Sequence, residues 1–315
     1  MIEKLDNLEG RSKRQMRTTF KSFCIRILIL LLFSCKESSS VGLPNLENKK
    51  GLLNRSLLYQ NQIREYILYI PQSYSEDTPL PVMLNFHGFG GTAKRHLRSA
   101  DMRELSESKG FILIYPQGTL LGNYSHWNPS LIGEGNKSIT DDLGFIDKLL
   151  TTLPEEINID SSRIYACGYS NGGFFSYGLA CNLYSQIAAI GSVAGTMMSD
   201  TYENCQATMP KPMINIHGVN DPIVPYEGAP GLVPINDVLN FWSELNFAEN
   251  VEINFFEGVE NYVYKDSIET PFVSHYKILN GTHTWDYNSL LSNNINTNEL
   301  IWEFVSKFDI NGFIE

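Results

Sequence analysis

The 315-residue sequence contains no apolar run close to the roughly 20 residues that a membrane-spanning helix requires. Basic residues are also scarce: the formal net charge is −11, and no long basic run follows the N-terminal segment. Because neutralising phosphates takes clustered Lys and Arg, we expect no nucleic-acid partner. The sequence also lacks HExxH, paired CxxC, a calcium loop, a Walker loop and a dinucleotide fingerprint. We therefore predict neither a metal site nor a cofactor.

A short apolar segment near the N-terminus has the pattern of a signal peptide. It follows basic residues and ends in Leu32-Phe33-Ser34-Cys35, which resembles the lipobox of bacterial lipoproteins. We predict a signal peptide over residues 1–35, with Cys35 as the lipidation site. The protein would then be secreted and lipid-anchored in a bacterial outer membrane or at the cell surface; an ordinary cleaved signal is the alternative. Because residues 1–15 are unusually charged, Met16 is a candidate for the true start.

The rest of the chain has the composition of a soluble globular protein, with 43% hydrophobic and 19% charged residues overall. Residues 36–60 are polar and rich in Asn and Ser, and we interpret them as a tether. Residues 61–315 show neither an internal repeat nor a second composition, which predicts a single domain. Contact with the membrane is expected only through the lipid anchor.

Segments typical of strands alternate with segments typical of helices from residue 61 onward. The expected strands are 66–70, 82–86, 111–115, 163–167, 188–193, 213–216, 251–256 and 273–279. The expected helices are 96–109, 141–153, 171–182, 236–245 and 297–308. This alternation predicts an α/β fold, in which helices cover both faces of a mostly parallel, twisted sheet. The Gly- and Asn-rich stretch 118–140 is a candidate loop over the active site.

The run Gly168-Tyr169-Ser170-Asn171-Gly172-Gly173 lies between the expected strand 163–167 and the expected helix 171–182. In the α/β-hydrolase fold, a Gly-x-Ser-x-Gly turn at such a junction lifts a serine hydroxyl to the edge of the sheet. The pattern alone is weak in a chain with 24 glycines, but the strand before it and the helix after it strengthen it. We predict that Ser170 is a nucleophile; a glycine–serine turn without chemistry is the alternative.

A nucleophilic serine needs a base and a carboxylate that orients the base. In this fold the order along the chain is Ser, then Asp or Glu, then His. Asp221 follows the expected strand 213–216, and His283 follows the expected strand 273–279. Both would lie beyond the carboxyl ends of their strands, so we predict a triad of Ser170, Asp221 and His283.

Other titratable residues could compete for these roles. His275 lies within a strand pattern, and His217 directly follows a strand, so packing or hydrogen bonding explains both. Asp237 opens an expected helix as a cap, and Asp266 lies in a polar loop. His87 we assign to shaping the glycine-rich loop in which it lies.

An oxyanion hole needs two backbone N–H groups directed at the developing charge. One should come from Asn171, the residue after the nucleophile. The other should come from the loop His87-Gly88-Phe89-Gly90-Gly91, where glycines let the backbone approach the substrate. Phe89 is the preferred donor and Gly90 the second candidate. Trp127, Tyr169 and Trp285 are expected to line the cleft, because sugars and phenolic acids stack on such rings; core packing is the alternative.

Three cysteines follow the predicted signal peptide, in a compartment where disulfides persist. Cys167 lies in an apolar strand pattern, where a buried free thiol is expected. The hypothetical bridge is therefore Cys181–Cys205.

The motifs in combination resemble those of the secreted polyhydroxybutyrate depolymerase/feruloyl esterase family. They are His-Gly-x-Gly-Gly at 87–91, Gly-Tyr-Ser-Asn-Gly-Gly at 168–173, His-Gly-x-x-Asp-Pro-Ile-Val-Pro-Tyr at 217–226 and Gly-x-His-x-Trp at 281–285. Asp141-Asp142-Leu143-Gly144-Phe145 is similar to the family's Asp-Asp-Val-Gly-Phe stretch. The match runs from about Arg64 to Trp285.

This resemblance implies an α/β-hydrolase fold, with Ser170 as nucleophile, Asp221 as the orienting carboxylate and His283 as general base. The chain departs from the family at two positions: many members have Cys or a small residue in place of Phe89, and Pro in place of Asp286. Both positions border the cleft, so the resemblance does not define the substrate.

We therefore predict an extracellular serine carboxylic-ester hydrolase that forms an acyl-enzyme intermediate. The expected substrates are small-molecule, oligosaccharide or polyester esters, with feruloyl or acetyl groups on carbohydrate, or hydroxyalkanoate units. Two alternatives remain open: a serine peptidase on the same fold, and a non-catalytic lipoprotein that binds glycans.

Overall fold

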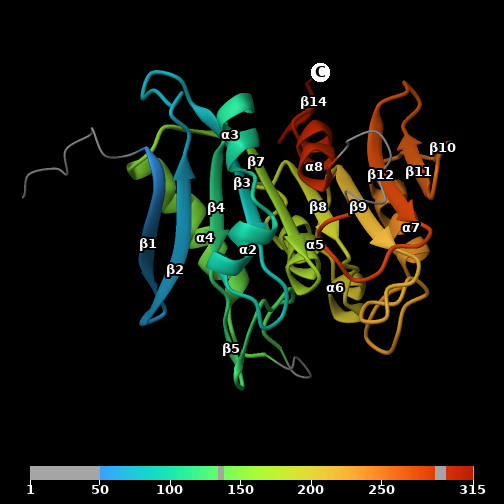
Figure 1. Cartoon of the computed structure of the whole chain (residues 1–315), viewed down its shortest axis with the longest axis horizontal. Coiled ribbons are helices and arrows are strands. Elements are labelled where there is room, and N and C mark those ends of the chain that lie inside the picture. The colour runs from blue at the N-terminus through green and yellow to red at the C-terminus, as the bar shows by residue number, and fades with distance from the viewer. Residues whose placement is uncertain (1–49, 134–137, 288–295, 315) are drawn as a thin grey trace, which may run out of the picture. The chain divides into compact units, whose positions relative to one another are not determined.

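A computed structural model describes residues 50–133, 138–287 and 296–314 of the chain (Figure 1). The predicted signal peptide, with Met16 and Cys35, and residues 36–49 of the predicted tether lie outside the described residues. Within those three ranges, no helix is both long enough and apolar enough to cross a membrane.

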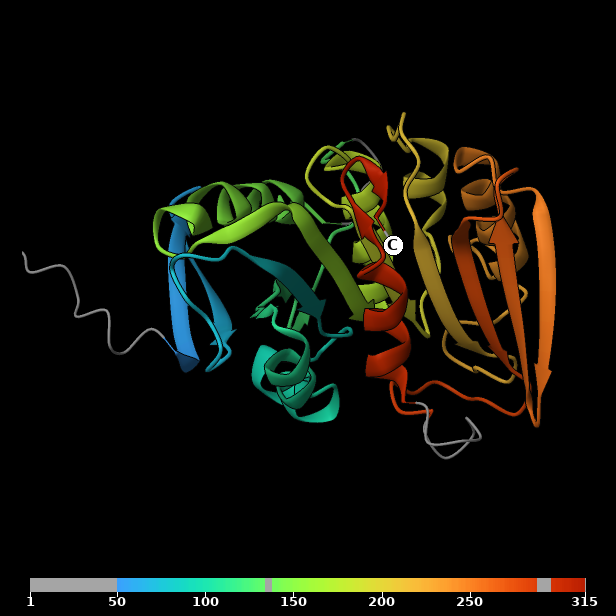
Figure 2. The same ribbon diagram turned by 90° about the horizontal axis from the view of Figure 1, so that it is seen from above.

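Ten strands of the described chain form one sheet, in the order β1-β2-β4-β3-β7-β8-β9-β12-β11-β10 (Figures 1 and 2). The strands are β1 (Gly51–Tyr59), β2 (Gln62–Ile70), β3 (Leu80–Phe86), β4 (Ile112–Pro116), β7 (Ile159–Tyr169), β8 (Ala189–Val193), β9 (Met213–Gly218), β10 (Asn250–Phe256), β11 (Val259–Lys265) and β12 (Pro271–Ile278). The six strands from β4 to β12 pair in parallel, and antiparallel pairs complete the sheet at each edge. The prediction of a mostly parallel sheet is confirmed.

Helices cover both faces of this sheet (Figure 2). One face carries α2 (Ala93–Ser99), α3 (Arg103–Lys109) and α8 (Thr297–Val305); the other carries α4 (Asp142–Thr152), α5 (Asn171–Asn182), α6 (Ser199–Glu203) and α7 (Ile235–Leu245). The short elements are η2 (Leu153–Glu155), β5 (Thr119–Leu121), β6 (Tyr124–His126), β13 (Phe308–Asp309) and β14 (Gly312–Phe313).

Each face of the sheet has its own hydrophobic core, as the pleat of a strand requires. Along β3, Val82, Leu84 and Phe86 point into the core shared with α4, α5 and α7, while Met83 points into the core shared with α2 and α8. All four side chains are fully buried, which explains why residues 82–84 form an apolar run without alternation.

The interpretation of residues 36–60 as a tether is wrong for residues 51–59. Residues 51–59 form β1, which pairs with β2 along its whole length through a two-residue turn. Both turn residues, Gln60 and Asn61, have positive φ, the conformation that joins twisted antiparallel strands. Leu53 and Leu57 pack against the core, but Arg55 between them hides the alternation of a strand.

The single helix predicted over 96–109 is in fact two helices, α2 and α3. Their break lies over Tyr115, whose hydroxyl donates to the carbonyl of Ala100 and accepts from the N–H of Met102. The Asp101 carboxylate accepts a hydrogen bond from the N–H of Arg103 at the start of α3. Local polar contacts therefore satisfy the backbone groups that a continuous helix would have paired, and the apolar period does not reveal this.

Cys181 and Cys205 form a disulfide across 24 positions of the chain, and Cys167 is a free, buried thiol. Cys181 is the penultimate residue of α5, and Cys205 follows α6 closely. Burial raises the pKa of the Cys167 thiol, so this side chain behaves as a small apolar residue.

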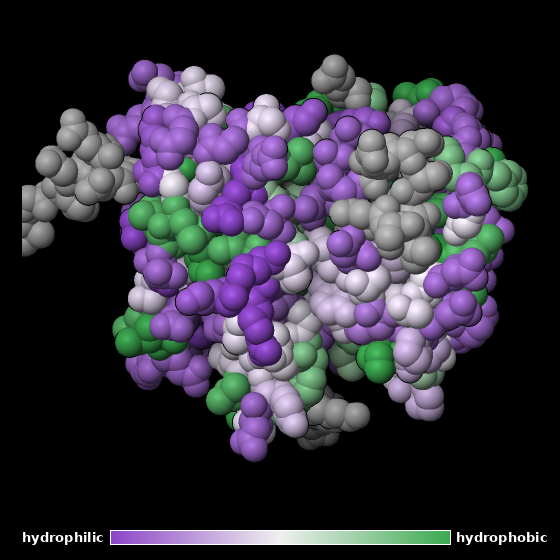
Figure 3. Space-filling view, viewed as in Figure 1, coloured by the Kyte–Doolittle hydropathy of each residue, from purple (hydrophilic) through white to green (hydrophobic). Residues whose placement is uncertain are grey.

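Hydrophilic side chains cover most of the face seen in Figure 3, with apolar side chains in separate patches.

Removing the disulfide should lower stability. The double variant Cys181→Ala/Cys205→Ala should lose about 3 kcal/mol of unfolding free energy, because the unfolded chain regains the entropy of an open loop of this length. Urea unfolding with and without reductant measures the loss. Reductant should lower the midpoint of the wild type and leave the double variant unchanged; an equal midpoint for all four samples would contradict the prediction.

Two buried histidines should make stability sensitive to acid. Burial lowers the pKa of His96 and of His275 to about 3, whereas the unfolded chain takes up these protons near pH 6.5. Between those values the unfolded state binds more protons, so its free energy falls relative to the folded state as pH decreases. From about pH 7.5 to about pH 5, each histidine should remove about 2 kcal/mol of unfolding free energy.

The measurement is urea unfolding at both pH values for the wild type, His96→Gln and His275→Gln. Each variant can be less stable overall, but its loss of stability between the two pH values should be smaller than that of the wild type. A loss of the same size in all three proteins would show that these histidines are not responsible.

Candidate active site

Ser170 lies at the junction of β7 and α5, in the conformation of a sharp strand-to-helix turn. Its φ of 54° and ψ of −117° are unusual for a residue with a side chain. The turn is held by two hydrogen bonds: the Ser170 N–H donates to Val193 O, at 2.9 Å, and Ser170 O accepts from the N–H of Phe174, at 3.0 Å. The side chain is 8% exposed and faces the cleft described below.

Two glycines make this turn possible. A Cβ on Gly168 would come within 2.3 Å of the backbone of Gly172, and a Cβ on Gly172 within 2.2 Å of the carbonyl oxygen of Phe86. No side chain fits at either position without moving α5 away from β3 and β7. The Gly-x-Ser-x-Gly spacing is therefore a packing requirement of this junction.

The structure brings His283 and Asp221 to Ser170. His283 Nε2 is 3.0 Å from Ser170 Oγ, and His283 Nδ1 is 2.7 Å from Asp221 Oδ2. Asp221 follows β9 and His283 follows β12, and these two strands are parallel neighbours. Their carboxyl ends meet at one edge of the sheet, which places residues 62 positions apart in contact.

The surroundings of Asp221 keep its carboxylate ionised. Burial alone would raise its pKa, but hydrogen bonds from His283 and from the N–H groups of Val224 and Ile223 outweigh it, and the pKa lies below its ordinary value. An ionised carboxylate can only accept, so His283 Nδ1 must be the donor. In the neutral ring, Nε2 then has its lone pair free to accept the proton of Ser170.

The competing residues are engaged elsewhere. His275 bonds Tyr226 Oη, at 2.8 Å, inside β12, and Asp266 accepts from backbone N–H groups of its own turn. His217 Nε2 bonds the carbonyl of Val224, at 2.8 Å, and lies 3.6 Å from Asp221 Oδ2. Burial lowers the pKa of His217, so the ring is neutral and supports the Asp221 turn by packing and hydrogen bonding. Asp237 lies in the first turn of α7.

The two candidate oxyanion donors in the glycine-rich loop after β3 differ in their hydrogen bonding. Gly90 N–H donates to Ser125 O, at 2.7 Å, and its φ is positive, so Gly90 is not available as an oxyanion donor. Among the hydrogen bonds of the described residues, none uses the N–H of Phe89 or the N–H of Asn171. His87 accepts from Gly118 N–H through Nε2, at 3.0 Å, and burial lowers its pKa to about 4, in keeping with its predicted role in shaping this loop.

Ser170 opens into a cleft of about 950 Å³. Its apolar lining comes from Phe89, Leu121, Leu131, Ile132, Phe174, Met198, Ile223 and Leu232. Its polar lining includes Ser130, Asn182, Ser199, Asp200, Thr201, Asn204 and Gln206. Within the described parts of the chain, no group of His, Cys, Asp or Glu side chains could hold a metal ion.

The three aromatic residues expected in the cleft have different positions. Trp127 lines the cleft but is 1% exposed, and its ring stacks on Phe175 in the core. Trp285 does not line the cleft: its indole N–H donates to Asn298 Oδ1, at 3.0 Å, and the ring is buried. Tyr169 is not part of the lining either; its hydroxyl donates to the carbonyl of His283, at 3.1 Å. Core packing, the alternative for these rings, therefore describes Trp285, and Trp127 combines it with a place in the lining.

Sequence reasoning did not identify the polar wall of the cleft, which we define as Asn182, Asp200, Asn204 and Gln206. Asn182 is the last residue of α5 and lines the cleft beside Asn204 and Gln206, which flank the bridged Cys205. Asp200 is the one Asp or Glu among the described lining residues. No motif marks these positions, because the disulfide and the short helix α6 bring them to the cleft.

Comparisons with known proteins agree with this fold. Residues 74–231, half of the chain, match the model of the phospholipase/carboxylesterase family. The chain is 24% identical over 250 residues to the bifunctional acetylxylan esterase/xylanase XynS20E of Neocallimastix patriciarum, covering 79% of this chain and 34% of that protein. It is 28% identical over 176 residues to feruloyl esterase C of Emericella nidulans, covering 53% of this chain and 59% of that protein. The chain thus spans only part of the length of these relatives.

Among solved structures, the acetyl xylan esterase from Aspergillus awamori has the same fold, with a TM-score of 0.58 and 16% identity. The similarity covers 81% of this chain and 99% of that one. The resemblance to feruloyl esterases and the α/β-hydrolase fold, both predicted from the motifs, are confirmed. The chain belongs to the phospholipase/carboxylesterase family of α/β-hydrolases.

Proposed function

We propose that this protein is a serine hydrolase of carboxylic esters that acts through an acyl-enzyme intermediate. The observation that carries the proposal is the hydrogen-bonded series Ser170–His283–Asp221, with distances of 3.0 and 2.7 Å, at the edge of a cleft. A hydroxyl, an imidazole and a buried carboxylate in this order are the components of nucleophilic acyl transfer.

The reaction would begin when Ser170 Oγ attacks the ester carbonyl carbon and its proton passes to His283 Nε2. The tetrahedral intermediate collapses as the bond to the alcohol oxygen breaks, and His283 returns the proton to that oxygen. Water then enters, gives a proton to His283 and attacks the acyl carbon. The bond between the acyl carbon and Ser170 Oγ then breaks, His283 returns its proton to Oγ, and the free acid departs. Asp221 remains ionised throughout and holds the imidazole in position.

The negative charge on the carbonyl oxygen would be stabilised by the N–H groups of Phe89 and Asn171. The first supporting observation is that hydrogen bonds of the described chain leave both groups unused, whereas that of Gly90 is used. The second is that both residues line the cleft together with Ser170. Losing one such donor typically costs about 2.7–4 kcal/mol of transition-state stabilisation.

The cleft supports esters of carbohydrates as substrates. Phe174 and Ile223 are close in the chain to Ser170 and Asp221, and Phe89 lines the same cleft from the glycine-rich loop, so the reacting ester would lie among apolar side chains. Asn171 and Asn182 begin and end α5 and both line the cleft, which therefore extends about 16 Å along the helix axis at 1.5 Å per residue. An apolar acyl group near Ser170 with sugar rings toward Asn182 fits this polarity.

Feruloyl and acetyl groups on polysaccharide fragments are therefore the proposed acyl groups, with hydroxyalkanoate esters second. The names of the relatives, acetylxylan esterase and feruloyl esterase, point in the same direction. We keep the extracellular location and the lipid anchor at Cys35 as part of the proposal, on the strength of the Leu-x-Ser-Cys motif.

Replacing the nucleophile tests the reaction. Ser170→Ala should lower turnover of p-nitrophenyl acetate by roughly 10⁴- to 10⁶-fold and abolish labelling by a fluorophosphonate probe. The matched control is Ser161→Ala, which removes an exposed hydroxyl from the same strand and should retain full activity. Unchanged turnover in Ser170→Ala would rule out this mechanism, and a wild type that the probe does not label would favour a glycan-binding protein without catalysis.

Altering the polar wall tests the substrate class. Gln206→Leu should lower kcat/KM for a feruloylated arabinoxylan oligosaccharide about fivefold, as losing one hydrogen bond typically does, and leave ethyl ferulate unchanged. Glu203→Gln is the control, because Glu203 lies in α6 but does not line the cleft. Steady-state kinetics on both substrates, on acetylated xylan and on hydroxybutyrate oligomers provides the comparison. Equal losses on both feruloyl substrates, or a preference for hydroxybutyrate oligomers, would contradict the assignment.

A further inference from the structure

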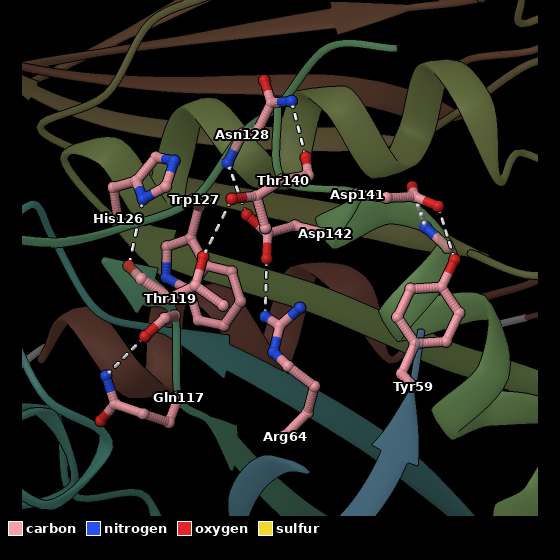
Figure 4. A network of polar contacts seen from close by, with 12 residues as sticks. Tyr59, Arg64, Gln117, Thr119, His126, Trp127, Asn128, Thr140, Asp141 and Asp142 are labelled. Carbon is pink, nitrogen blue, oxygen red and sulfur yellow. Dashed lines mark hydrogen bonds and ion pairs between the residues drawn. The ribbon is translucent and has the colours of Figure 1, made fainter. Parts of the chain in front are cut away.

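A buried ion pair lies outside the triad and outside the cleft lining. Arg64, from β2, and Asp142, the first residue of α4, are joined by a contact of 2.6 Å between Arg64 Nη2 and Asp142 Oδ1 (Figure 4). Their side chains are 3% and 0% exposed. The guanidinium also lies 3.9 Å from the centre of the Phe145 ring. Removing two charges from water is unfavourable, and well-packed apolar residues often stabilise such a site equally well.

The second oxygen of Asp142 reaches the segment in front of α4. Asp142 Oδ2 accepts a hydrogen bond from the N–H of Asn128, at 2.8 Å. The side chain of Asn128 donates a hydrogen bond to Thr140 O, at 2.9 Å (Figure 4). This bond joins Asn128 to the backbone two residues before Asp142. One carboxylate thus connects β2 and α4 with the backbone at Asn128.

Residues 125–128 in turn contact both sides of the proposed oxyanion hole. On one side, Trp127 N–H donates to Asn171 Oδ1, at 2.7 Å, and Asn171 Nδ2 donates to Trp127 O, at 2.9 Å. On the other side, the indole N–H of Trp127 donates to His87 O, at 3.1 Å, and Ser125 O accepts from Gly90 N–H, at 2.7 Å. His87 and Gly90 flank Phe89.

We propose that Arg64 and Asp142 are positioning residues for ester hydrolysis. Their ion pair fixes residues 125–128 through Asn128, and this segment sets the distance between the N–H groups of Phe89 and Asn171. The inference rests on the proposed function, because it assigns those two groups to the oxyanion. A carboxylate suits this role, since each of its two oxygens accepts one of the two hydrogen bonds. An amide in its place has one acceptor oxygen for the two donors.

The test compares Asp142→Asn with its neighbour Asp141→Asn. Asp141 lies at the same end of α4, but it accepts hydrogen bonds from Tyr59 Oη in β1 and from the N–H of Gly144 in α4 (Figure 4). Asp142→Asn should lower kcat for p-nitrophenyl acetate at least tenfold with KM within about twofold, up to the 10²- to 10³-fold that loss of one oxyanion donor causes. Asp141→Asn should retain kcat, with any loss confined to thermal stability.

A transition-state analogue separates positioning from folding. An aryl trifluoromethyl ketone adds to the serine as an oxyanion, so its inhibition constant should rise in Asp142→Asn by the same factor as kcat/KM falls. All rates are normalised to the active sites that a fluorophosphonate probe titrates, which removes misfolded protein from the comparison. An unchanged inhibition constant, or an equal loss of kcat in both variants, would overturn the proposal.

The double variant Arg64→Met/Asp142→Leu covers the case in which Asp142→Asn fails to fold. Replacing a buried ion pair with apolar residues of similar volume often preserves stability, but it leaves the Asn128 N–H without its acceptor. We expect a folded protein with lowered kcat. Wild-type kcat in this variant would also overturn the proposal. Failure of the proposed function itself is recognised separately, by activity that survives Ser170→Ala.

Discussion

The close approach of α5 to the sheet at Ser170 is the constraint on which the rest of the structure depends. Gly168 and Gly172 have no room for a Cβ, because the backbone of α5 lies directly against β7 and the end of β3. This contact forces the positive φ of Ser170 and lifts its hydroxyl to the edge of the sheet. It also brings the Asn171 N–H, at the start of the helix, close to the glycine-rich loop that follows β3, so the proposed nucleophile and the proposed oxyanion donors are held by one packing contact.

A parallel sheet supplies the remaining members of the triad at the same edge. His283, the proposed base, follows β12, and Asp221 follows β9, the parallel neighbour of β12. Three donors surround the Asp221 carboxylate: two backbone N–H groups bond Oδ1, and His283 bonds Oδ2. The buried ring of His217 lies 3.6 Å from Oδ2. These contacts lower the pKa of the carboxyl despite its burial, and so fix which nitrogen of His283 carries the proton.

The arrangement of the three triad side chains could be predicted from the sequence, because each of them follows the end of an apolar strand. Ser170, Asp221 and His283 were predicted from their order and their positions after apolar strands, and the structure places them in contact. What the sequence could not reveal depends on contacts between distant segments. Arg55 hid the alternation of β1, polar contacts around Tyr115 divided one apparent helix into two, and Trp285 packs inward because its indole N–H finds Asn298.

The stretch 118–140 illustrates the same limit in its composition. Its Gly, Asn and Ser residues indicated a loop over the active site, yet Trp127 and Asn128 are buried. The Asn128 N–H is held by Asp142, whose carboxylate is paired with Arg64, far away in the chain. The Trp127 ring anchors this segment in the core. The hydrogen bond from the Asn128 N–H to a fixed carboxylate adds a directional contact that orders the backbone beside it. An apolar pair at this position would supply packing but no hydrogen-bond acceptor for the backbone. The charged pair supplies that acceptor, and this explains why a buried pair of charges suits the position.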